Sequence, residues 1–466
     1  MQADDVHYLE LTEVARRIRV GALSPVELTR AILDRIAALD PKLKAYATLT
    51  PEIALEQARR AEAEIARGAI RGPLHGVPIA VKDLCYTKGV PTAAGMPIHK
   101  GFRPDHDATV VSRFAAAGAV LLGKLQLTEG AFADHHPEIT PPVNPWHPDH
   151  WSGASSSGSG VATAAGLCYA SLGSDTGGSI RFPSAANGVT GLKPTWGRVS
   201  RYGVFALAES LDHIGPMTRS AADAAAVLGV IAGADANDPT TRQEPVPNYL
   251  AGLERGIRGL RVGVDPQLNA GGVDAEVVAM VEEAVGVLAD LGAKVEEVAF
   301  PPIDEAVRQW LPLCGVETAV AHEATDPAQA ERYGPALKGL IELGRGLGGQ
   351  ELAKILLVRE ELRGRVAALF EGIDLLVIPA QYAASPTTAR MATLGEDPNA
   401  INMLLRFTSP FDMTGSPTIT LTGGFTDRGL PIAFQLVSRH LEEDLLCRAG
   451  HAYQLATDWH KRRPPV

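Results

Sequence analysis

Ser174-Asp-Thr-Gly-Gly-Ser-Ile-Arg-Phe-Pro-Ser184 places one serine directly behind two glycines. Glycine has no Cβ, so a backbone with two of them can turn tightly and direct successive N–H groups at one bound oxygen. An enzyme that transfers acyl groups needs such a turn, with a nucleophile beside an oxyanion hole. The stretch therefore makes Ser179 a candidate nucleophile and Thr176, Gly177 and Gly178 candidate oxyanion donors.

Two segments upstream carry side chains that could activate this serine. Ser152-Gly-Ala-Ser-Ser-Ser-Gly-Ser-Gly160 runs directly into small apolar residues, so a flexible linker is the weaker interpretation. Lys82 follows five apolar residues at 77–81. Burial there would lower the pKa of the lysine, and a fall to near 7 corresponds to about 4 kcal/mol. One lysine and two serines indicate a hydrolase that activates serine without histidine.

The overall composition limits the classes of partner. The chain has 466 residues, of which 45% are hydrophobic, so it can form a substantial core. Its formal net charge of −11 at pH 7 argues against nucleic-acid partners, which need clustered lysine and arginine. The four cysteines lie far apart without a C-x-x-C pair, so we expect free buried thiols rather than a zinc site or a disulfide scaffold.

The start of the chain, Met1-Gln-Ala-Asp-Asp-Val-His-Tyr8, has neither a cationic nor an apolar region, so we expect no signal peptide. No stretch approaches the roughly 20 apolar residues of a membrane-spanning helix. These observations predict a soluble, cytoplasmic protein without a membrane partner.

Apolar strand-like segments alternate with helical patterns along the chain. Residues 8–67 show helical spacing, and residues 70–230 combine buried strands with the candidate site. Residues 303–370 are helical and could form an insertion that walls a pocket. Because the alternation predicts a sheet covered by helices on both faces, and no linker interrupts it, we expect a single α/β/α domain over residues 1–466.

The candidate segments together resemble the amidase signature family over essentially the whole chain. The matching stretches are Leu74-His-Gly-Val-Pro-Ile-Ala-Val-Lys-Asp-Leu84, Asp175-Thr-Gly-Gly-Ser-Ile-Arg-Phe-Pro-Ser184, Gly191-Leu-Lys-Pro-Thr195, Gly197-Arg198, Ser210-Leu-Asp212, Gly215-Pro216 and Gly429-Leu-Pro-Ile-Ala-Phe-Gln-Leu-Val437. The resemblance implies an α/β/α domain with a mixed, mostly parallel central sheet. It also implies a hydrolase of small aryl or aliphatic amides that uses no cofactor and no metal, with esters and carbamates (urethanes) as further substrates.

The resemblance gives each candidate residue a role. Ser179 resembles the nucleophile of the family, Ser155 its bridging serine after a cis peptide bond, and Lys82 its terminal base. The backbone donors implied for the oxyanion hole are Thr176, Gly177 and Gly178. The residues implied to support the site are Ser156, Asp175 and Arg181, the last two as an ion pair.

One segment departs from the family pattern. Gly153-Ala-Ser-Ser-Ser-Gly-Ser159 stands where the family has Gly-Gly-Ser-Ser-Gly-Gly-Ser. Ala154 therefore precedes the bond implied to be cis, and alanine restricts the backbone more than glycine does. The sequence leaves the geometry of that bond open, and Ser157 could add a hydroxyl near the site.

Histidines offer two weaker alternatives for the chemistry. One loop holds four of them, His135, His136, His147 and His150. They could bind a metal, but no helical H-x3-H pair supports a site, and a solvated polar loop is the preferred interpretation. A Ser-His-Asp triad would need His213 and Asp212, yet adjacent side chains rarely face each other.

The substrate and the partners stay open at this point. Candidate pocket walls are the 303–370 stretch and the loop at 391–407, through the apolar residues Leu313, Leu337, Ile341, Leu356, Met403 and Phe407. The chain also resembles the A-type component of glutamyl-tRNA amidotransferases, which would take glutamine and add two protein partners and tRNA. No clear charged pair for the amino and carboxylate groups of glutamine is visible. A non-catalytic binding protein on the same fold is the third alternative, and a homodimer is left open.

Overall fold

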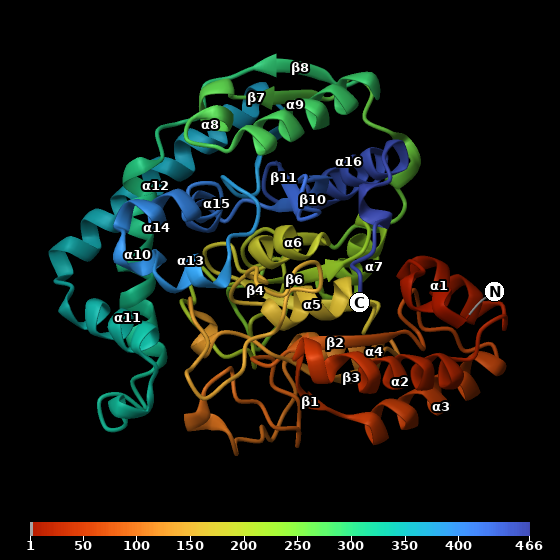
Figure 1. Ribbon diagram of the computed structural model, residues 1–466. Coiled ribbons are helices and arrows are strands. Elements are labelled where there is room, and N and C mark those ends of the chain that lie inside the picture. The colour runs from red at the N-terminus through yellow and green to blue at the C-terminus, as the bar shows by residue number, and fades with distance from the viewer. Residues whose placement is uncertain (1–2) are drawn as a thin grey trace.

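A computed structural model describes residues 3–466 of the chain, and within them one sheet of eleven strands runs through the molecule (Figure 1). The strands are β1 Tyr46–Leu49, β2 Pro78–Lys82, β3 Val120–Leu125, β4 Ala170–Asp175, β5 Thr190–Lys193, β6 His213–Thr218, β7 Arg261–Val264, β8 Lys294–Glu297, β9 Leu375–Pro379, β10 Thr418–Phe425 and β11 Pro431–Val437. Their order across the sheet is β1-β3-β2-β4-β6-β5-β10-β11-β9-β7-β8. The predicted mixed sheet in a single α/β domain is confirmed.

The prediction that this sheet is mostly parallel is wrong. Among the pairs within residues 3–466, β3–β2, β2–β4, β9–β7 and β7–β8 are parallel. The other six pairs, which include the whole centre from β4 to β9, are antiparallel. The physical reason is the length of the connections. Only five residues join β10 to β11, which suffices for a hairpin but not for the crossover that parallel strands need.

Helices flank the sheet, and each begins and ends within the described residues. They are α1 Leu11–Arg19, α2 Pro25–Leu43, α3 Pro51–Ala66, α4 Thr109–Ala116, α5 Ser157–Ala164, α6 Arg181–Asn187, α7 Ala221–Ile231, α8 Pro266–Ala270, α9 Ala275–Asp290, α10 Asp304–Ala321, α11 Pro335–Gly346, α12 Gly349–Gly372, α13 Thr388–Ala392, α14 Pro398–Leu405, α15 Ser409–Thr414 and α16 Glu443–Ala456. None of the helices found in residues 3–466 has the length and apolar character to cross a membrane.

Two helical regions stand at opposite sides of the molecule (Figure 1). Helices α1 to α3 occupy the stretch 8–67, and the edge strand β1 lies among them because it pairs with β3. The start of α2 follows from local sequence, since Ser24 Oγ accepts a hydrogen bond from the Glu27 amide and Pro25 stands at the first helical position. Helices α10 to α12 make up the stretch 303–370 on the other side. Its description as an insertion stays a prediction.

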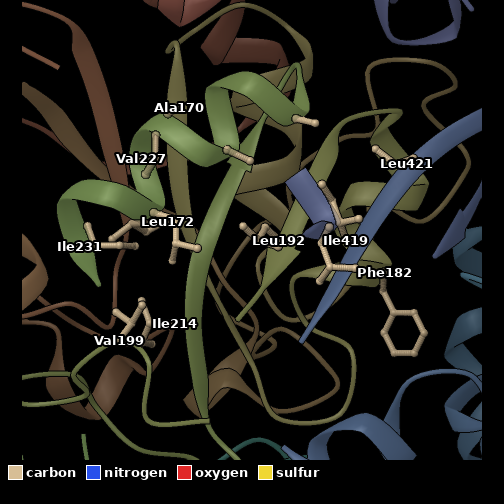
Figure 2. Close-up of a cluster of buried hydrophobic side chains, with 14 of the residues drawn as sticks. Ala170, Leu172, Phe182, Leu192, Val199, Ile214, Val227, Ile231, Ile419 and Leu421 are labelled. Atoms are coloured by element: carbon tan, nitrogen blue, oxygen red, sulfur yellow. The ribbon is translucent and has the colours of Figure 1, made fainter. Parts of the chain in front are cut away.

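The core lies between the central strands and the helices that cover them. Figure 2 shows apolar side chains from β4, β5, β6 and β10 that gather with Val227 and Ile231 of α7. Every residue of β2, β3, β4, β5, β6 and β11 is buried, as expected for strands with helices on both faces. Each fully buried leucine or isoleucine contributes about 1.5–3 kcal/mol. This rigid centre carries the candidate site. The four cysteines are free and buried, as the sequence predicts.

Candidate active site

Lys82 ends β2 and is completely buried. Its Nζ lies 2.6 Å from Ser155 Oγ and 2.8 Å from Ser174 Oγ, and it donates a hydrogen bond to each. The structure therefore joins two of the three predicted catalytic side chains. It also adds Ser174, which the sequence analysis did not select because a serine inside a strand gives no signal of its own.

The protein surroundings make this lysine a weaker base than a solvated one. Burial lowers the pKa of Lys82 to about 7, although the acidic groups Cys85, Asp175 and Asp212 work in the opposite direction. A substantial fraction of the side chain is therefore an uncharged amine at neutral pH, in the direction that the apolar run at 77–81 predicts.

Ser155 precedes α5 in a closely packed turn. The Ala154–Ser155 peptide bond is cis, which settles the question that Ala154 left open. The next residue ties the turn to β4, since Ser156 Oγ donates to the Ser174 carbonyl (3.2 Å) and accepts from the Ser174 amide (3.3 Å). Ser156 thus fixes the segment of Ser155 relative to the strand that also presents Ser174 to the lysine.

Ser179 lies in the turn between β4 and α6 and borders a cavity of about 310 Å³. Its side chain is partly exposed, whereas Ser155 and Lys82 lie beneath the surface. Among the hydrogen bonds of residues 3–466, none joins Ser155 Oγ to Ser179 Oγ. Such contacts are often long in ligand-free enzymes and tighten when substrate binds.

The oxyanion turn differs from the prediction at one residue. The Gly178 amide donates to Asp175 Oδ1 at 2.7 Å, so it already has an acceptor. In the described part of the chain, the amides of Thr176 and Gly177 make no hydrogen bond. The reason is that Asp175 folds back over the turn, where its carboxylate also accepts from the Ile180 amide at 2.9 Å. Of the three predicted donors, Thr176 and Gly177 have amides available to a substrate.

Two side chains from distant segments hold the carbonyls of this turn. Trp310 of α10 donates from Nε1 to the Thr176 carbonyl (2.7 Å), and Thr408 donates from Oγ1 to the Gly177 carbonyl (2.6 Å). The C=O and N–H of one trans peptide point in opposite directions. Fixing the Thr176 carbonyl therefore fixes the direction of the Gly177 amide. A Cβ at Gly177 would also lie 2.3 Å from the Trp310 ring.

Asp175 and Arg181 form the predicted ion pair, with Arg181 Nη2 at 2.7 Å from Asp175 Oδ1. The same nitrogen lies 2.6 Å from Asp412 Oδ2, and all three side chains are buried. Burial opposes the charge of Asp175, but Arg181 outweighs it and holds the pKa of that carboxyl below its ordinary value. Burial and the neighbouring Asp175 raise the pKa of Asp412 well above its ordinary value.

Apolar side chains dominate the walls of the cavity. The lining residues with large side chains are Phe132, Trp151, Phe182, Leu207, Trp310, Leu311, Met391, Leu394, Ile401, Leu404 and Leu405. They include residues of both predicted regions, the helical stretch and the loop at 391–407, which contains α14 and the 3-10 helix η6 Leu394–Glu396.

The individual wall residues expected from the sequence do not line this cavity. They are Leu313, Leu337, Ile341, Leu356, Met403 and Phe407. Four of them are buried in the core, and Leu356 is exposed on α12. A sequence shows which helix carries apolar residues, but which of them face a cavity depends on the rotation of that helix against its neighbours.

The histidine alternatives find no support in the geometry. The described residues contain no group of three or more histidine, cysteine or acidic side chains placed to hold a metal ion. His135 lies 3.1 Å from Ser157 Oγ, and His150 lies 2.7 Å from the Ser385 carbonyl. His213 is hydrogen bonded to the Leu211 carbonyl, whereas Asp212 accepts from Thr176 Oγ1 at 2.6 Å. The two do not form a pair.

Comparison with known proteins agrees with this geometry. A family model described as Amidase matches residues 27–447. The chain belongs to the amidase signature family. As a member of it, the chain is an amidase-family hydrolase that acts on small-molecule amides.

Relatives of different function resemble this amidase signature protein over its full length. The Mycobacterium tuberculosis protein named "Putative amidase AmiD" is 50% identical over 466 residues, which is all of this chain and 98% of that protein. The A-type component of the glutamyl-tRNA(Gln) amidotransferase of Chloroflexus aggregans is 39% identical over 99% of both chains. The solved peptide amidase from Stenotrophomonas maltophilia superposes with a TM-score of 0.82 at 32% identity, over 98% of each chain.

Proposed function

We propose that this protein hydrolyses small apolar amides through an acyl-enzyme, with Ser179 as nucleophile, Ser155 as bridging serine and Lys82 as base. The observation that carries the proposal is the 2.6 Å hydrogen bond between a buried lysine of lowered pKa and Ser155. A base with a pKa near the working pH is the most effective for proton transfer. Ser179 contributes the exposed hydroxyl that such a base can activate.

The reaction follows from these positions. Neutral Lys82 accepts the proton of Ser155 while Ser155 accepts that of Ser179, whose Oγ attacks the substrate carbonyl carbon. The amides of Thr176 and Gly177 stabilise the resulting oxyanion, and each such donor lowers the barrier by roughly 3–4 kcal/mol. The proton returns through Ser155 to the leaving amine as the C–N bond breaks. Water then attacks the ester of Ser179 by the same relay and releases the acid.

The lining of the cavity supports an apolar acyl or aryl group as the substrate. Around Ser179 it offers aromatic and aliphatic side chains, such as Trp151, Phe182 and Leu404. Apolar walls bind by removing hydrocarbon surface from water and place few demands on the leaving group. Aryl and aliphatic amides are therefore the proposed substrates, with esters and carbamates (urethanes) as side reactions.

A substrate panel tests the proposal directly. Wild type and Ser179→Ala are compared on matched p-nitroanilide, ester and carbamate substrates with the same apolar acyl group. We expect amide cleavage by wild type and a loss of at least roughly 10³-fold in Ser179→Ala. Thr163→Ala, which removes a buried hydroxyl bonded to Ser171 and away from the cavity, is the control. Equal turnover by Ser179→Ala would refute the assignment of the nucleophile.

The second candidate function is that of the A-type component of a glutamyl-tRNA amidotransferase, which the 39% identity keeps open. Glutamine would bring a carboxylate that needs a cation, and the cavity lining contains none. This observation favours the free amidase. Glutaminase activity that appears only with two partner proteins and tRNA would favour the amidotransferase instead.

A further inference from the structure

One charged side chain, Asp134, stands among the residues that line the cavity around Ser179. It is exposed and lies two residues after Phe132 in the loop after β3. The other lining residues are apolar or uncharged, and Ser179 and Thr176 provide the hydroxyl groups. A single carboxylate on an otherwise apolar wall gives the site a definite sign of charge.

No cation of the described chain neutralises this carboxylate. None of the ion pairs found in residues 3–466 includes Asp134, although acidic groups elsewhere pair readily, as Glu360 does with Arg363 at 2.8 Å. The protein surroundings desolvate the neighbouring His135, which lowers its pKa to about 4 and keeps it uncharged at neutral pH. A charge on the substrate would therefore be the nearest partner that Asp134 meets.

Resting on the hydrolysis proposed above, we propose that Asp134 makes the site selective for amides that carry a positive charge remote from the scissile bond. The same carboxylate disfavours substrates with a carboxylate at that end. The apolar walls hold the hydrocarbon part of the substrate, and Asp134 meets the ammonium group where the cavity opens to water. The substrate class is thus an apolar amide with a terminal amine.

The electrostatics favours this selectivity in both directions. Opposite charges attract and like charges repel with similar strength at equal distance. A partly exposed pair is worth up to roughly fivefold in affinity, and low-dielectric walls increase the effect. The ratio of kcat/KM between an ammonium and a carboxylate substrate should then exceed roughly tenfold.

Three p-nitroanilides with one shared chain length test the inference. Each has a carbonyl and four methylenes, ended by an ammonium (5-aminopentanoyl), a methyl (hexanoyl) or a carboxylate (adipoyl) group. For the full-length protein we expect kcat/KM to fall in that order, after subtraction of spontaneous release. In Asp134→Asn the ammonium-to-carboxylate ratio should fall by roughly tenfold.

Glu138→Gln is the matched control, because it removes the same charge from the same loop outside this cavity. It should keep the wild-type ratio. A second measurement needs no variant: raising the salt from about 0.05 to about 0.5 M should reduce the wild-type preference, since salt screens exposed charges.

The outcomes separate the inference from the function on which it rests. An equal ratio in wild type and Asp134→Asn, or an equal loss in Glu138→Gln, would overturn the role of Asp134 while leaving the amidase proposal intact. If wild type cleaves none of the three anilides, or Ser179→Ala cleaves them equally well, the proposed function fails first.

Discussion

At the scale of single residues, the central feature is an amine that protein burial keeps near its titration point. Lys82 has no exposed surface and touches two hydroxyls, and its pKa lies at about 7. A solvated lysine would be protonated at neutral pH and could not accept a proton from serine. The burial of β2 therefore has a direct chemical consequence.

The first prediction concerns pH. Because only uncharged Lys82 can accept a proton, kcat/KM should fall as the pH drops through about 7 and level off above it. Lys82→Ala should lose at least roughly 10³-fold at neutral pH, and the loss should ease at high pH, where hydroxide assists. A wild-type profile that stays flat on both sides of neutral pH would exclude Lys82 as the base.

Ser174 gives a second prediction at this scale. Its hydroxyl accepts a hydrogen bond from Lys82 Nζ, and an acceptor favours the charged form of an amine. Ser174→Ala should therefore lower the pKa of Lys82 further and move the acid limb of kcat/KM to lower pH.

The measurement for Ser174→Ala is the same pH profile, with Ser159→Ala as the control, since Ser159 Oγ donates to the Leu172 carbonyl rather than to the lysine. A limb that stays in place, or that moves to higher pH, would show that Ser174 does not act on the lysine.

At the scale of elements, the site depends on one helix outside the catalytic segments. Helix α10 brings Trp310 onto the oxyanion turn, where its ring borders both the cavity and Gly177. The wall that selects the substrate and the donor that stabilises the transition state are therefore parts of one contact.

Trp310→Phe should separate these two roles. It keeps an aromatic wall but removes the hydrogen bond to the Thr176 carbonyl, so the Gly177 amide loses part of its orientation. We expect kcat to fall by roughly tenfold, with KM and the thermal midpoint nearly unchanged. Trp459→Phe in the C-terminal 3-10 helix η7 Trp459–Lys461 is the control. A change in KM alone would limit Trp310 to substrate binding.

At the scale of the whole molecule, the buried Arg181 joins segments more than 200 residues apart. It bonds Asp175 beside the oxyanion turn, Asp412 of α15 and the Thr408 carbonyl (2.8 Å). The sequence motif contains the first pair, but only the fold adds the second carboxylate. The network connects the N-terminal part of the sheet to the C-terminal segment that closes the site.

Arg181→Met should destabilise the protein strongly, because two buried carboxylates lose their cation. We expect the free energy of unfolding to fall by about 3–5 kcal/mol. Arg363→Met, which breaks an exposed pair with Glu360, should cost less than about 0.5 kcal/mol. Urea unfolding of both variants measures the difference. Similar losses in the two would show that the buried network is not a special source of stability.

Local sequence determined the chemistry of the turn and of the lysine. Two adjacent glycines, a following serine and an apolar run before Lys82 act over a few residues, so their consequences could be predicted without the fold. The same holds for the helical stretches, whose spacing is local, and for the buried strands, which are continuous apolar runs.

Only the tertiary structure decided which distant groups meet. It set the antiparallel centre of the sheet, placed Ser174 and Trp310 beside the reacting groups, occupied the Gly178 amide with Asp175, and chose which apolar residues face the cavity. These features depend on strand order and on helix rotation. Both arise from packing between segments far apart in the chain, where local propensity carries no information.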